Sequence, residues 1–158
     1  MPIDIRNTRQ LPVNNSNILE AARNLLRSEG VPEAEISVFI TDDETIREYN
    51  RDFRAIDKST DVLSFPLFDP TEIADIKAKP PKEGPLLGDV IISLDTAIRQ
   101  AEEFHIELHE EISLLLVHGI LHLLGYDDQD EISATIMREK ENMALMGAGL
   151  RHRYWESM

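Results

Sequence analysis

Apolar and polar residues alternate along the chain with two different periods, which predict strands and helices in a definite order. A period of two predicts short strands over residues 3–5 and 36–40, and denser apolar runs predict strands over 62–66 and 87–93. Apolar positions spaced three and four apart predict helices between and after these strands. The pattern therefore predicts about four strands and about five helices, opening as strand, helix, strand, helix.

Capping residues help to place the helices. A capping box of Thr41 and Glu44 predicts a helix that turns Phe53 and its other apolar residues inwards. Ser93 can cap a helix that runs to about residue 104, and a last helix is predicted over about 130–146.

Residues 67–86 are predicted to form a mobile loop between two neighbouring strands. The segment holds Pro70, Pro80, Pro81 and Pro85 among many charged residues. Long loops beside a site often shape its entrance.

Residues 114–124 are apolar on nearly every side, which predicts a buried helix. His118 and His122 interrupt this run four residues apart, so both imidazoles leave the same face of the helix. Buried rings lose water unless each nitrogen finds a partner, and a divalent cation would satisfy both rings at once. The spacing therefore favours a metal site, although two histidines hydrogen-bonded within the core would give the same pattern.

The turn after this helix supplies candidates for a third ligand. Gly125 fits the left-handed position that ends a helix and lets the chain fold back. Either Asp127 or Asp128 could then return towards the two histidines. Three protein ligands leave one position of a zinc ion open for water, which is typical of a catalytic site.

A second histidine pair, His105 and His109, has the same spacing but lies among glutamates such as Glu110 and Glu111. We interpret this pair and its acidic neighbours as a solvated surface. Gly119 occupies the position where metalloproteases of the H-E-x-x-H type carry their general-base glutamate. Peptide hydrolysis by that mechanism therefore lacks its base.

Composition limits the ligands and the compartment. The chain has 158 residues, 42% of them hydrophobic, which suits one domain over residues 1–158. It has no cysteine, so a metal must be held by histidine and carboxylate. The amino terminus shows no signal segment, and no apolar run approaches the length of a membrane span, so we expect a soluble cytoplasmic protein.

Three separated segments of the chain match one known signature. Residues 118–128 read HGILHLLGYDD, residues 54–66 place an arginine ahead of TDVLSFP, and residues 87–90 read LGDV. These segments resemble the YbeY family of bacterial endoribonucleases and rRNA maturation factors, whose patterns are H-G-x-L-H-L-x-G-Y-D-H and T-[DN]-V-L-S-F-P. Three motifs in the right order are far more specific than a lone H-x-x-x-H. The resemblance implies a single α+β domain with a small mixed sheet and the metal helix at its centre.

The resemblance also implies a set of site residues. One zinc ion would be held by His118, His122 and Asp128, and Arg54 would be the functional arginine of the cleft. The family's usual third ligand is histidine, and Asp128 stands in its place. A carboxylate ligates zinc at about the same distance but makes the site less positive. We therefore predict a weaker Lewis acid, a higher pKa of bound water and a shift towards harder ions such as manganese. Asp127 is assigned to the turn, and an exchange of roles between the two aspartates stays open.

The function implied by the resemblance is metal-dependent endonucleolytic cleavage of single-stranded RNA. The family acts in 3′-end maturation of small-subunit rRNA and in ribosome quality control, so the small ribosomal subunit and its proteins are expected partners. The net charge of −14 opposes attraction to RNA, so binding needs a local basic patch, for which Arg51, Arg54 and Lys58 are candidates. The main alternative is a non-catalytic ribosome assembly factor that the metal stabilises, and a metallohydrolase of small molecules or peptides is a more distant one.

Overall fold

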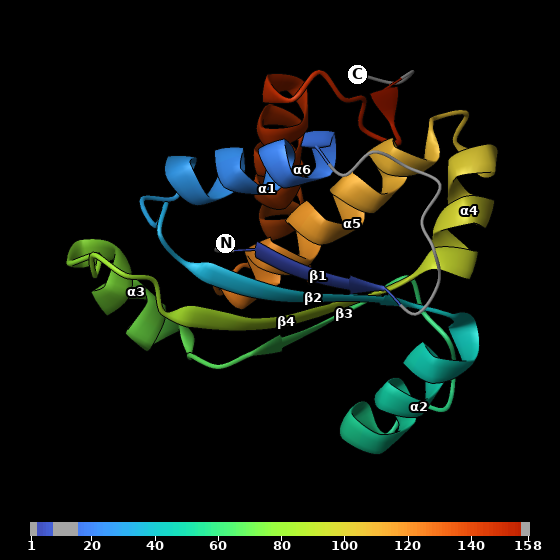
Figure 1. Cartoon of the computed structure of the whole chain (residues 1–158), viewed down its shortest axis with the longest axis horizontal. Helices are drawn as coiled ribbons and strands as arrows, with labels where there is room; N and C mark the ends of the chain where they lie inside the picture. The colour runs from blue at the N-terminus through green and yellow to red at the C-terminus, as the bar shows by residue number, and fades with distance from the viewer. Residues whose placement is uncertain (1–2, 8–15, 156–158) are drawn as a thin grey trace.

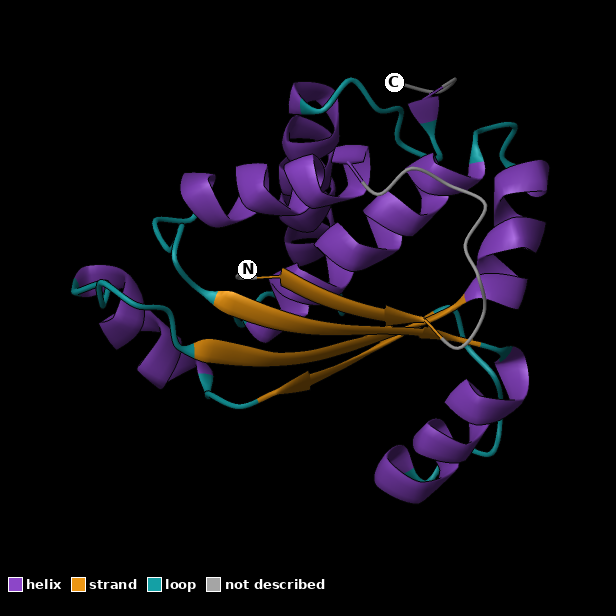
Figure 2. Ribbon diagram, viewed as in Figure 1, coloured by secondary structure: helices purple, strands orange, loops and turns teal. Residues whose placement is uncertain are grey.

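The computed structural model describes residues 3–7 and 16–155, which form one mixed sheet with helices around it (Figures 1 and 2). In chain order the elements are β1 (Ile3–Asn7), α1 (Ser16–Ser28), β2 (Glu35–Thr41), α2 (Asp43–Arg54), β3 (Val62–Pro66), α3 (Pro70–Ala78), β4 (Leu86–Ser93), α4 (Leu94–Glu103), α5 (Leu108–Leu123) and α6 (Glu131–Gly147). The α+β class is confirmed, with one helix more than predicted. None of the helices within the described ranges is long and apolar enough to cross a membrane.

The sheet has the strand order β1-β2-β4-β3. Strand β2 pairs in parallel with both β1 and β4, whereas β3 pairs antiparallel with β4 at the edge of the sheet. In this register Ser64 of β3 lies opposite Val90 of β4. The two strands that contain the TDVLSFP and LGDV segments are therefore neighbours.

Helix α5 lies between the sheet and the outer helices α1 and α6 (Figure 1), which explains why it is apolar on nearly every side. At Gly119 it approaches the sheet closely, because an added Cβ would lie 2.6 Å from Val90 Cγ1. The hydroxyl of Ser64 donates to the Gly119 carbonyl oxygen at 3.0 Å. The predicted central position of this helix is confirmed, and the packing at Gly119 leaves no room for a general-base glutamate there.

The segment between β3 and β4 contains a helix, α3, where we predicted an irregular loop. Asp69 caps this helix by accepting from the Glu72 amide at 2.8 Å, and the Glu72 side chain returns to the Asp69 amide at 3.1 Å. Pro70 occupies the first turn, where its missing N–H costs nothing. The prolines and charges suggested a loop, but Asp69 and Glu72 form a capping box that starts a helix.

Helix α2 also differs from its prediction. Asp42, and not Thr41, is the N-cap, and its carboxylate accepts from the Thr45 amide at 2.8 Å. Thr41 is the last residue of β2. Phe53, which we predicted to face inwards, is 68% exposed. The helix packs against the sheet mainly through Ile46, which is fully buried. In its last turn the exposed Phe53 ring meets Phe65 of the edge strand β3 at a centroid distance of 5.7 Å.

The glutamates at the start of α5 are buried, although we predicted a solvated surface. Glu110 accepts from the Arg151 guanidinium at 2.8 Å, and Glu111 accepts from Arg153. These arginines follow α6 and fold back over α5, an arrangement that the local charge pattern does not reveal. His105, in the turn before α5, is exposed as predicted.

Candidate metal centre

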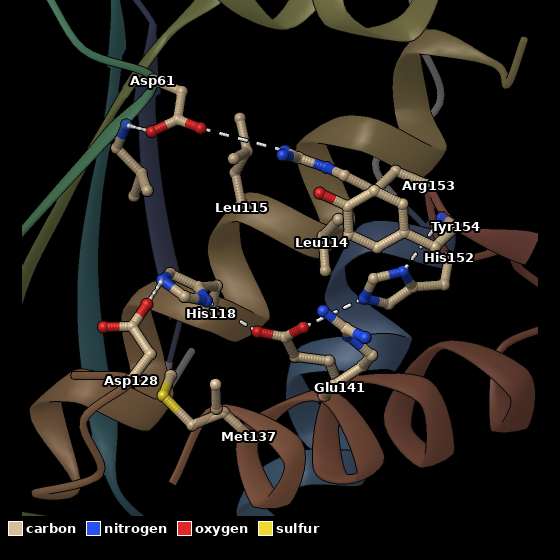
Figure 3. Close-up of a pocket in the computed structure, with 13 residues that line it drawn as sticks. Asp61, Leu114, Leu115, His118, Asp128, Met137, Glu141, His152, Arg153 and Tyr154 are labelled. Carbon is tan, nitrogen blue, oxygen red and sulfur yellow. Dashed lines mark hydrogen bonds and ion pairs between the residues drawn. The ribbon is translucent and has the colours of Figure 1, made fainter. Parts of the chain in front are cut away.

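Two histidines of α5 and an aspartate of the following turn bring their side chains together at the surface of the fold. The Nε2 atoms of His118 and His122 are 3.1 Å apart. An oxygen of Asp128 lies 3.7 Å from His118 Nε2 (Figure 3). One potential ligand atom from each residue lies within 4.8 Å of the others. The three residues assigned from the sequence therefore form a group that can hold one metal ion.

Each histidine is oriented by an acceptor at its other ring nitrogen. His118 Nδ1 lies 2.6 Å from a carboxylate oxygen of Glu141, and His122 Nδ1 lies 2.9 Å from the Tyr126 carbonyl oxygen. An ionised carboxylate and a carbonyl only accept, so both Nδ1 atoms carry hydrogen and donate. Both Nε2 lone pairs then point towards the space between the two rings. Because two lone pairs at this distance repel each other, a shared proton or a cation is needed between them. This is the tautomer in which histidines bind metals through Nε2.

The protonation preferences of the two rings diverge. Burial opposes the charged form of His118, but the hydrogen bond and charge of Glu141, with a contribution from Asp128, raise its pKa above the ordinary value. Burial and the neighbouring His118 lower the pKa of His122. Of the two rings, His118 therefore holds a proton more readily, and a metal ion that binds its Nε2 would have to displace that proton.

The turn between α5 and α6 separates the roles of its aspartates. Gly125 adopts the left-handed conformation that we predicted, with φ of 95°. Asp127 accepts from the Gln129 amide at 3.3 Å, and Asp130 caps α6 by accepting from the Ser133 amide at 2.8 Å. Asp128 is left to face the histidines.

Glu141, which the sequence analysis did not single out, joins the site to the carboxyl-terminal segment. Its carboxylate accepts from His118 and, at 3.0 Å, from His152 Nε2. Both Glu141 and His152 are buried. Burial raises the pKa of Glu141, but the hydrogen bonds from both histidines outweigh it and hold the pKa below its ordinary value. Glu141 lies four residues from buried Met137 and four from buried Leu145, and a carboxylate on such an apolar stripe signals a buried partner.

Tyr126 anchors the turn that holds His122. Its hydroxyl donates to Glu29 at 2.5 Å, and the Glu29 carboxylate also accepts from Lys77 at 3.0 Å and Lys140 at 2.9 Å. Burial raises the pKa of Glu29, but the three donors outweigh it and lower the pKa. Glu29, which follows α1, and residues from α3 and α6 thus fix the carbonyl group that orients His122.

A cleft runs along both sides of His118. On one side a cavity of about 310 Å³ is lined by His118, His122 and Arg54, and on the other a cavity of about 370 Å³ is lined by His118 and Asp128 (Figure 3). Arg54 Nη2 donates to the Ser64 carbonyl oxygen at 2.7 Å. Arg51 pairs with Asp52 at 3.0 Å, and Lys58 lines neither cavity. Of the three residues predicted to form a basic patch, only Arg54 therefore lines this cleft.

Comparison with known proteins gives consistent matches. A family model described as Endoribonuclease YbeY matches residues 4–149. Curated proteins called Endoribonuclease YbeY are similar to this chain. The one from Heliobacterium modesticaldum is 46% identical over 124 residues, which cover 78% of this chain and 74% of that protein. The one from Moorella thermoacetica is 44% identical over 137 residues, which cover 86% and 85%.

A solved structure shares the fold. The solution structure of a Thermotoga maritima protein aligns with a TM-score of 0.63 at 25% sequence identity. The alignment covers 98% of this chain and 92% of that one. The similarity therefore extends over nearly the whole fold described above.

Proposed function

This chain belongs to the Endoribonuclease YbeY family, and on that premise we propose that it is a metal-dependent endoribonuclease that cuts single-stranded RNA. It is thus a hydrolase of phosphodiester bonds. One observation supports the metal-dependent reaction above all: two Nε2 lone pairs and a carboxylate converge in a cleft that also contains an arginine.

The residues present fit a resident metal ion. His118, His122 and Asp128 would hold it, with zinc as the proposed ion and manganese favoured more than at a site of three histidines. A bound ion would supply a Lewis acid for a phosphoryl oxygen and lower the pKa of a bound water. Glu141 and the Tyr126 carbonyl would keep both rings in the tautomer that binds.

Arg54 is proposed to bind the scissile phosphate. Its guanidinium donates to the Ser64 carbonyl oxygen, lies 5.7 Å from the Phe65 ring and lines the cavity beside the two histidines. A planar guanidinium can donate two parallel hydrogen bonds to phosphate oxygens. It would stabilise the negative charge that develops on those oxygens during cleavage.

We further propose the biological setting that the family implies. The substrate would be rRNA of the small ribosomal subunit, cut during maturation of its 3′ end, and the partners would be that subunit and its proteins. The protein would act in the cytoplasm, with residues 1–158 working as one domain. The chain's net charge of −14 supports a need for such partners, because it weakens attraction to free RNA.

Metal content and RNA cleavage test this function together. The parent should hold about one ion per chain and cut single-stranded RNA, and chelator or Asp128→Ala should remove both properties. Asp127→Ala is the matched control, because it removes a neighbouring carboxylate from the turn and should keep metal and activity. Metal binding without cleavage in the parent would instead favour the non-catalytic assembly factor.

Arg54→Ala should keep its metal and lose catalysis. We expect kcat to fall by about 10²-fold to 10³-fold, the usual cost of losing one donor to a developing negative charge. Steady-state cleavage of a labelled RNA, with metal content measured on the same preparation, checks this. Arg51→Ala is the control. It also removes one positive charge from α2, but from a side chain that pairs with Asp52. Equal activity in both variants would refute the role of Arg54.

A further inference from the structure

We propose that the cavity on the Asp128 side of His118 is a nucleotide subsite, in which Tyr154 stacks on an unpaired base and Arg138 binds an adjacent phosphate. This inference rests on the proposed function, because it places the RNA strand beside the metal ligands. It assigns the substrate's path on the side of His118 opposite Arg54.

The cavity has the size and surface that a nucleobase needs. Its volume is about 370 Å³, and its floor is formed by the buried apolar side chains of Leu114, Leu115 and Met137. Figure 3 shows Tyr154 on the opposite side of the space from Asp128, with His118 and Glu141 between them. A rigid apolar floor with a ring at one side can accept the flat face of a base.

Tyr154 is held in place by other rings, so its orientation is set before a ligand binds. Phe104 meets it edge-on at a centroid distance of 5.5 Å, and His152 lies against it at 5.6 Å and 30°. The Tyr154 amide also donates to His152 Nδ1 at 3.2 Å. Tyr154 nevertheless remains 39% exposed. An exposed aromatic ring fixed from behind is the usual platform for stacking an unpaired base.

Arg138 supplies the positive charge of this cavity. Its guanidinium carbon lies over the Tyr154 ring, 5.1 Å from the ring centroid, so a base that stacks on this face would displace it from the ring. Within the described ranges Arg138 forms no ion pair. The other arginine that lines the cavity, Arg153, is neutralised by Glu111. Arg138 is therefore the cation available to a phosphate next to a base stacked on Tyr154.

The carboxylates of the cavity do not cancel this charge. Glu141 is occupied by His118 and His152, and Asp61 accepts from the Val62 amide at 2.8 Å and lies 3.8 Å from Arg153. Asp128 belongs to the proposed metal centre, where a cation would offset it. Each of these carboxylates thus has a partner other than Arg138, whose side chain is exposed.

The subsite is connected to the metal centre through hydrogen bonds. These run from His118 through Glu141 and His152 to the backbone of Tyr154. His118 lines this cavity and the one that contains Arg54. A strand passing His118 would thus contact Arg54 on one side and Arg138 on the other. Tyr154 follows the family-matched residues 4–149, so this chain's own carboxyl-terminal segment would provide the base platform.

Cleavage kinetics and oligonucleotide binding of the metal-loaded protein test the subsite. Tyr154→Leu should raise KM for single-stranded RNA, and Kd for a short fluorescein-labelled 2′-O-methyl RNA, by about 5-fold to 100-fold, the range for losing one stacked base. Tyr154→Phe should restore both values, because it keeps the ring. Metal content and kcat should change little in either variant.

Arg138→Gln gives an independent reading of the phosphate contact. The slope of log Kd against log salt should become shallower by about 0.7, as expected when one phosphate contact of a single strand is lost. Arg27→Gln is the control, since Arg27 lies in the last turn of α1 and lines neither cavity of the cleft.

The outcomes separate this proposal from the function on which it rests. Unchanged KM, Kd and salt slope in the Tyr154→Leu and Arg138→Gln variants of a protein that cuts RNA would overturn the subsite alone. If the parent cuts no RNA, the proposed nuclease fails, and oligonucleotide binding then decides. Weaker binding by Tyr154→Leu would still support the subsite, and no binding by the parent would overturn it.

Discussion

His118→Ala and His122→Ala are expected to lose the metal equally but to differ in the stability of the metal-free protein. His118→Ala removes the donor from buried Glu141, which keeps only His152, and breaking such a pair should lower the free energy of unfolding by about 2–3 kcal/mol. His122→Ala removes a single hydrogen bond to the Tyr126 carbonyl oxygen, which should lower it by about 1 kcal/mol. Urea unfolding in the presence of chelator measures both.

The pH dependence of the same experiment identifies the cause. The pKa of His118 is raised, so its contribution is complete below the ordinary value of 6.5 and is lost as pH rises through the folded value. The pKa of Glu141 is lowered, so its contribution is present above 4.5 and is lost as pH falls through the folded value. The gap between parent and His118→Ala should therefore be widest between pH 4.5 and 6.5. A gap that is constant with pH would mean that lost packing, and not the Glu141 pair, destabilises the variant.

The metal centre could be predicted from sequence because most of it is local. His118 and His122 are one helical turn apart, and Gly125 marks the turn that brings Asp128 back within a few residues. Helical periodicity and one left-handed position suffice to place three side chains together. Arg54 was different, since only its resemblance to a family motif distinguished it from other exposed charged residues.

The supporting residues could not be predicted because they meet across long distances in the sequence. Glu29 reaches Tyr126 across 97 residues, and Glu141 reaches His118 across 23. At Glu111 the local charge pattern predicted a solvated side chain, because the residue lies in an acidic stretch, but Glu111 is fully buried. Its partner Arg153 lies 42 residues later in the sequence, and periodicity carries no information about that contact.

Arg153→Met is expected to be among the most destabilising changes in the carboxyl-terminal segment. Glu111 is fully buried and accepts from Arg153 and, at 2.7 Å, from Gln100. Without the guanidinium, Glu111 must stay charged without its ion pair or take up a proton, so the free energy of unfolding should fall by about 3 kcal/mol. Equilibrium urea unfolding of parent and variant at several pH values checks this.

The control for this change is the double variant Glu111→Gln with Arg153→Met. A neutral amide removes the unpaired charge, so the double variant should recover most of the lost stability.

The pH dependence of the stability gives a second test. Burial already holds the pKa of Glu111 above its ordinary value despite Arg153 and Gln100, and losing Arg153 raises it further. A raised pKa means that stability is complete below 4.5 and declines as pH rises, so the deficit of Arg153→Met should grow from acid to neutral pH. If the double variant is as unstable as Arg153→Met at every pH, the loss comes from the packing of Arg153 on Phe104, whose ring centroid lies 4.9 Å from the guanidinium, and the buried charge is not its cause.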